Sequence, residues 1–177
     1  MARRVDEMKS SRVKEGSGST LQPFNLSTLQ FTNRQRTKRI NRRLLRQITE
    51  AVLAKLPKIK SWDLTFHLVS ARRISEINET HLGHEGPTDV ITFDYNALEN
   101  PELLCGEIFI CIEVAVEQAR EFRTTWQSEL VRYIIHALLH LCGHDDLAPA
   151  PRRQMKQVEN RLVRRFSQRF DFAALGC

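Results

Sequence analysis

The sequence predicts one α/β (α+β) domain, in which a mixed sheet of about four strands packs against about five helices. Its 177 residues are enough to bury one core, and no apolar run reaches the roughly 20 residues that span a bilayer. Segments with apolar residues at alternate positions are interspersed with segments that show helical spacing. That mixed order of strands and helices is typical of α/β domains.

The first half of the chain opens with a segment that has no periodicity. Residues 1–20 are polar and basic, with Gly and Ser near their end. This composition predicts a flexible tail, and the domain is expected to cover 24–170. The next four elements are a strand, a helix closed by a proline, an alternating strand and a helix that a serine can cap. In chain order they cover 25–32, 37–56, 62–69 and 71–81.

The second half begins with a loop at 83–87, where Gly and Pro are typical of turns. Two short apolar strands and a helix follow at 90–93, 106–111 and 112–122. A long helix that Thr125 can cap then runs to near Gly143. The last helix follows two prolines at 149 and 151 and has an apolar stripe from 155 to 170.

The net charge of +6 is unevenly distributed along the chain. Residues 1–46 hold 12 Lys and Arg against 3 acids, 47–150 hold 8 against 16, and 151–170 hold 7 against 1. An acidic middle between two basic segments predicts a polyanionic partner that contacts the ends of the chain. The alternative, that these charges are solvated helix faces, stays open at this point.

The cysteines and the N-terminus indicate a cytoplasmic protein. The four cysteines form no CxxC pair and are interpreted as reduced thiols, and residues 1–20 lack the apolar core of a secretory signal. An organelle transit peptide stays open because this segment is rich in Arg and Ser. Its acids, Asp6, Glu7 and Glu15, count against one.

Two histidines carry the clearest chemical signal in the chain. His136 and His140 are four residues apart, so their imidazoles share one helix face and can converge on one metal ion. The turn after Gly143 offers two candidates for a third ligand, Asp146 and His144. We expect Zn²⁺ with water in the remaining position, because zinc lowers the pKa of bound water to about 7. Ala137 occupies the position of the general base in HExxH proteases, which argues against a protease.

Three segments resemble the YbeY family of bacterial rRNA-maturation endoribonucleases. Residues 136–146 resemble its HGxLHLxGYDH signature, 86–93 resemble PTDVLSF, and 106–119 are similar to GDIVI followed by a spaced A and QA. The motifs lie in the family's order over roughly 24–170. The resemblance implies a zincin-like metal-binding helix, one zinc ion, and a single-strand-specific endoribonuclease acting at the 3′ end of 16S rRNA and in ribosome quality control.

The chain departs from the family pattern at two functional positions. Aligned on Gly143, the third family histidine corresponds to Asp146, and the family tyrosine corresponds to His144. We rank Asp146 ahead as the third ligand, because a helix broken at Gly143 turns His144 away from the other two. The family arginine, six residues before Thr88, corresponds to Leu82, so that role does not transfer.

Other arginines are candidates for contact with substrate. Arg72 and Arg73 lie near the missing family arginine, and Arg152 and Arg153 begin the basic face of the last helix. The expected partner is rRNA in the small ribosomal subunit, with neither membrane nor DNA. Two alternatives remain: a non-catalytic, metal-containing ribosome-assembly factor, and a metallohydrolase of another substrate.

Overall fold

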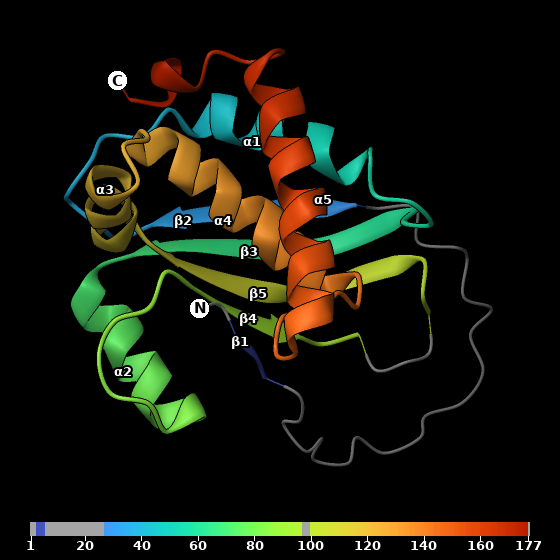
Figure 1. Ribbon diagram of the computed structural model, residues 1–177, viewed down its shortest axis with the longest axis horizontal. Coiled ribbons are helices and arrows are strands. Elements are labelled where there is room, and N and C mark those ends of the chain that lie inside the picture. Colours follow the sequence, from blue (N-terminus) through green and yellow to red (C-terminus); the bar gives the residue numbers. More distant parts are fainter. Residues whose placement is uncertain (1–2, 6–26, 97–99, 177) are drawn as a thin grey trace, which may run out of the picture.

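The strands of the computed structural model, which describes residues 3–5, 27–96 and 100–176, form one mixed sheet (Figure 1). The order across the sheet is β1-β4-β5-β3-β2. Only β4 and β5 are antiparallel, and the other neighbours are parallel. The strands are β1 (Arg3–Val5), β2 (Thr28–Asn33), β3 (Ser61–Val69), β4 (Val90–Asp94) and β5 (Leu103–Cys111).

The expected mixed α/β fold is confirmed, with one short strand added at an edge. β1 lies within the segment predicted as a flexible tail and pairs with β4. The rest of that predicted tail lies outside the described residues. A three-residue strand has too little periodicity to be detected in a polar sequence, so only its pairing with β4 defines it.

In the part of the chain that the structure describes, five α-helices and one 3-10 helix accompany the sheet, and most begin at a recognisable cap. They are α1 (Arg42–Leu53), α2 (Ala71–Leu82), α3 (Ile112–Glu121), α4 (Trp126–Leu141), α5 (Pro149–Ser167) and η1 (Phe172–Leu175). α1 begins at Arg42 rather than at 37, because the Asn41 side chain accepts a hydrogen bond from the backbone N–H of Leu44. None of the described helices is long and apolar enough to cross a membrane.

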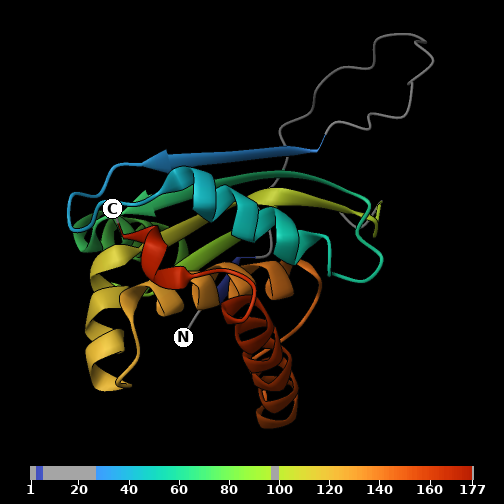
Figure 2. The same cartoon turned by 90° about the horizontal axis from the view of Figure 1, so that it is seen from above.

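The helices cover the two faces of the sheet unequally (Figure 2). α1, α4 and α5 share one large apolar core with residues from one sheet face, and α4 is its centre. α2 packs on the other face in a smaller cluster around Ile74, Ile91 and Phe93. Because α4 is buried along most of its length, its two histidines have a rigid support.

Gly106 lets β4 and β5 approach closely beneath α4. A Cβ atom at this position would lie 2.3 Å from the backbone oxygen of Phe93, closer than real atoms come. Leu141, the last residue of α4, would be 3.4 Å from the same Cβ. The glycine therefore permits the close strand pairing on which the end of α4 rests.

Candidate metal centre

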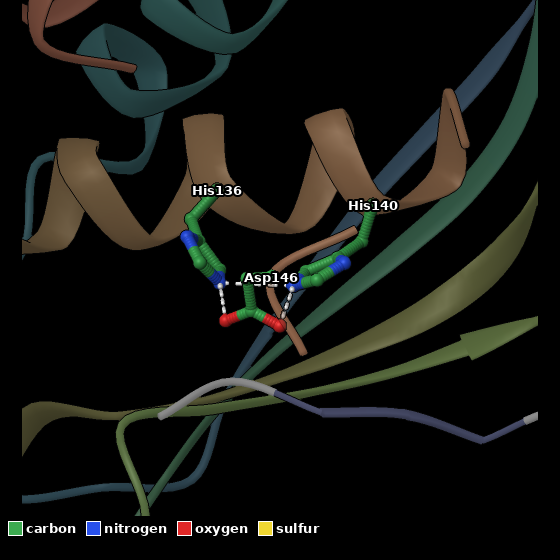
Figure 3. A group of neighbouring side chains, drawn as sticks. All are labelled: His136, His140 and Asp146. Carbon is green, nitrogen blue, oxygen red and sulfur yellow. Dashed lines mark hydrogen bonds and ion pairs between the residues drawn. The ribbon is translucent and has the colours of Figure 1, made fainter. Parts of the chain in front are cut away.

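His136 and His140 project from the same face of α4 (Figure 3). Their Nε2 atoms are 3.0 Å apart, and both rings are largely shielded from solvent. Thr125 caps the start of the helix by accepting a hydrogen bond from the Ser128 N–H at 3.2 Å. The two imidazoles therefore point to one place, as expected for residues four apart on one helix face.

Asp146 completes a group of three side chains. After α4 ends, Gly143 adopts a φ of +85°, and the chain turns back toward the histidine face. The two oxygens of Asp146 lie 4.0 Å from His136 Nε2 and 3.8 Å from His140 Nε2. Among the described residues, these are the three whose ligand atoms all lie within 4.8 Å of one another as a metal site requires. The His144 side chain is not part of that group.

The outer nitrogen of each imidazole faces a hydrogen-bond acceptor. His136 Nδ1 donates to Glu159 Oε2 at 2.9 Å, and His140 Nδ1 donates to the backbone oxygen of His144 at 3.0 Å. A carboxylate and a carbonyl can only accept, so each Nδ1 carries a proton, and the neutral form of each ring then offers its Nε2 lone pair to a metal. Such outer contacts orient histidine ligands in metal sites. His144 therefore contributes its backbone to the centre.

Glu159 is held in place by a second partner on α4. Its other oxygen accepts a hydrogen bond from Arg132, which also donates to Asn160 and lies 3.5 Å from Glu129. Burial raises the pKa of Glu159, but the hydrogen bonds from His136 and Arg132 outweigh it and hold the pKa below its usual value. Glu159 is thus an ionised acceptor behind His136.

The donor set fits a zinc ion. With zinc–ligand distances of about 2.0–2.1 Å, tetrahedral ligand atoms lie about 3.3 Å apart. The spacings of 3.0, 3.8 and 4.0 Å bracket that value. Two imidazole nitrogens and a carboxylate that converge in this way form a donor set of the kind that zinc prefers. His136, His140 and Asp146 can therefore hold a divalent metal and leave a coordination position for water.

The remaining predicted site residues are dispersed. Arg152 lies beside the metal group, where its Nε donates to the backbone oxygen of Asp146 at 2.7 Å. A cavity lies next to the metal group and is lined in part by His136 and Asp146. Arg153 is exposed on α5 and does not line this cavity. Arg72 and Arg73 both pair with Glu76 on the surface of α2, at 3.1 Å, and do not line that cavity either.

Leu82, which occupies the position of the family arginine, lines a different cavity from the one at the metal group. Leu82, the last residue of α2, lines a cavity of about 270 Å³ together with Asn78, His84 and Thr88. Asp89, the neighbour of Thr88, lines the cavity at the metal group, and its carboxylate accepts the Val90 N–H at 2.9 Å. That contact favours an anchoring role for Asp89.

Comparison with known proteins shows to which family the sequence belongs. Residues 30–167 match the family described as endoribonuclease YbeY. The chain belongs to this family. Its members include Chlorobium luteolum endoribonuclease YbeY, 43% identical over 90 residues, which are 51% of this chain and 64% of that protein. The Parabacteroides distasonis endoribonuclease YbeY is 38% identical over 104 residues, 59% of this chain and 71% of that one.

A solved structure has a similar fold. The solution structure of TM1509 from Thermotoga maritima superposes with a TM-score of 0.55 at 28% identity, covering 77% of this chain and 87% of that one. The three YbeY motifs identified in the sequence lie within the matched residues, so the resemblance is confirmed.

Sequence reasoning missed two residues that support the centre. Glu159 and Arg132 are 27 residues apart and meet only because α5 packs across α4. One signal was present: Glu159 is the single acid among the seven cations of residues 151–170, and it stands on the apolar stripe. An acid on a buried helix face requires a partner.

Proposed function

We propose that this member of the YbeY family is a zinc-dependent, single-strand-specific endoribonuclease acting on rRNA, at the 3′ end of 16S rRNA and in ribosome quality control. The observation that carries the proposal is the convergence of His136, His140 and Asp146, within 4.8 Å, at the family's metal-binding motif. The small ribosomal subunit as partner and a cytoplasmic location belong to the same proposal.

Each residue near the metal group has a definable task. His136, His140 and Asp146 hold the ion, and Glu159 and the His144 carbonyl fix the two imidazoles. When bound, zinc supplies an activated water and offsets negative charge on a phosphate. The rigid helix keeps the ligands in position without reorganisation, which is how a charged transition state is best stabilised.

A His136→Ala variant tests the proposal. It removes one ligand and one imidazole contact to Glu159, so metal content and cleavage of single-stranded rRNA precursor should both be lost. His81→Ala, an exposed histidine at the end of α2, is the matched control and should behave as wild type. Full metal content together with full cleavage by His136→Ala would overturn the proposal.

A second function has one observation in its favour. Leu82 replaces the family arginine, so a cation expected near a phosphate is missing there. That loss favours a non-catalytic ribosome-assembly factor that binds rRNA and in which the metal has a structural role. Binding of rRNA precursor without cleavage, by wild-type protein shown to be fully metal-loaded, would select this function.

A further inference from the structure

A groove runs from the metal group along α4. Its volume is about 340 Å³, and it is lined by residues of α3, α4 and α5 as well as by His136 and Asp146. Figure 2 shows α3 and α5 projecting from the two ends of α4, on the side away from the sheet. The groove thus has α4 as its floor and the other two helices as its walls.

The α5 wall presents two cations to the groove. Arg152 is positioned by hydrogen bonds to the backbone oxygens of Asp146, at 2.7 Å, and Leu147, at 3.4 Å. Lys156, one turn further along the same helix face, is exposed and makes no hydrogen bond or ion pair to any residue that the structure describes. Glu159, the acid one turn beyond, is occupied by His136 and Arg132. The Lys156 ammonium is therefore available to an anion.

The opposite wall presents an aromatic ring. Phe122, the C-cap residue directly after α3, is 57% exposed, although an apolar ring of this size is normally buried. The turn holds it firmly, because its N–H donates to Gln118 at 2.8 Å and the Thr124 N–H donates to Ala119 at 2.9 Å. Arg123 adopts a left-handed φ of 55°, a conformation that usually requires glycine.

From these two walls we infer a nucleotide subsite in which Phe122 stacks on one base of single-stranded RNA and Lys156 binds a neighbouring phosphate. Stacking on an exposed ring and charge pairing with the backbone are the two contacts that proteins use for single strands. Paired bases are already stacked in a duplex, so Phe122 provides selection for single strands. This inference rests on the proposed function and names its substrate-binding residues.

A base-deletion cycle tests the stacking. The probe is a short fluorescent RNA single strand, compared with the same strand carrying an abasic nucleotide at each position in turn. Phe122→Ala should weaken anisotropy-measured binding of the intact strand about 5- to 150-fold, and Phe122→Trp should restore it. On the strand that lacks the stacked base, Phe122→Ala and wild type should bind with equal affinity, because the contact between ring and base is already absent.

Tyr95 offers the matched control for the ring. It is 51% exposed and does not line the groove, so Tyr95→Ala should bind as wild type. Equal losses for Phe122→Ala and Tyr95→Ala, or a Phe122→Ala loss that persists at every abasic position, would overturn the stacking contact. Wild-type protein that fails to bind the single strand would overturn the subsite itself.

The salt dependence of binding tests the lysine. Lys156→Gln should reduce the slope of log K against log salt by about 0.7–1, the contribution of one phosphate contact, and Lys156→Arg should preserve it. Lys55→Gln removes an exposed lysine away from the groove and should leave the slope unchanged. An unchanged slope in Lys156→Gln would refute the phosphate contact. Binding is read without cleavage, so a catalytically inactive wild type would refute the nuclease function and leave the subsite standing.

Discussion

Replacing Glu159 with glutamine should weaken zinc binding without touching a metal ligand. Glu159 is 7% exposed and shares its two oxygens between His136 Nδ1, at 2.9 Å, and Arg132. A glutamine has one oxygen for these two donors. If the oxygen faces His136, the amide N–H₂ meets Arg132. If the amide is turned round, its N–H₂ meets His136 Nδ1 and favours the tautomer that carries a proton on Nε2, toward the metal.

Either arrangement costs metal affinity. Loss of an outer partner of a histidine ligand typically lowers metal affinity 10- to 100-fold, about 1.4–2.7 kcal/mol. We therefore expect Glu159→Gln to raise the zinc dissociation constant by about that factor, measured by competition with a chromophoric chelator. Long-range nitrogen–proton NMR spectra of the metal-free protein should show a shift in the tautomer of His136.

Glu129→Gln is the control for this experiment. Glu129 is 2% exposed, lies 3.5 Å from Arg132 and accepts a hydrogen bond from Thr124, but it does not contact a histidine. It should keep zinc affinity within about twofold of wild type, since the contact to His136 is intact. Wild-type affinity in Glu159→Gln would refute the orienting role of Glu159. Equal weakening in both variants would assign the effect to Arg132 and the packing of α5 instead.

Three further outcomes are expected. Elemental analysis should show that Asp146→Ala loses zinc. His144→Ala should retain zinc, because His144 contributes its backbone oxygen and not its side chain. The reverse result would make His144, not Asp146, the third ligand. Gly106→Ala should destabilise the fold by about 1–3 kcal/mol in urea unfolding, since its Cβ would lie 2.3 Å from the Phe93 oxygen; wild-type stability would show that β4 can shift freely. Burial raises the pKa of the Cys111 thiol from 9.0 to about 12. The folded state therefore keeps this proton longer than the unfolded state, and stability should fall as the pH rises above about 9. Cys111→Ala should flatten that fall, and an unchanged slope would contradict it.

The loss of the family arginine changes how the groove must meet its substrate. Leu82 lines a separate cavity of about 270 Å³ together with Asn78, His84 and Thr88, and the described residues around that cavity include no Lys or Arg. Arg72 and Arg73, its neighbours in sequence, are paired with Glu76 on the surface. The cations of the metal groove come instead from α4 and α5, which is why the proposed phosphate contact lies on α5.

Local patterns in the sequence were enough to predict most elements and the core of the centre. The i, i+4 spacing placed His136 and His140 on one helix face, because helical geometry is set by sequence separation alone. Gly143 marked the end of that helix, and the motif order indicated the YbeY family, which the comparisons confirm. The start of α1 was placed five residues too early, because the capping contact of Asn41 competes with periodicity.

The contacts that complete the centre depend on tertiary packing. Arg132 meets Glu159 across 27 residues, and Phe122 lines the same groove as residues of α5. β1 pairs with β4 although Arg3 and its partner Ile91 are 88 residues apart. Sequence by itself determined which residue types could bind a metal and which helix would carry two of them. Only the packing of α5 against α4 decided which acid orients His136 and which cations line the groove. Contacts between distant segments form when both apolar faces are buried together, and local spacing in the sequence does not encode them.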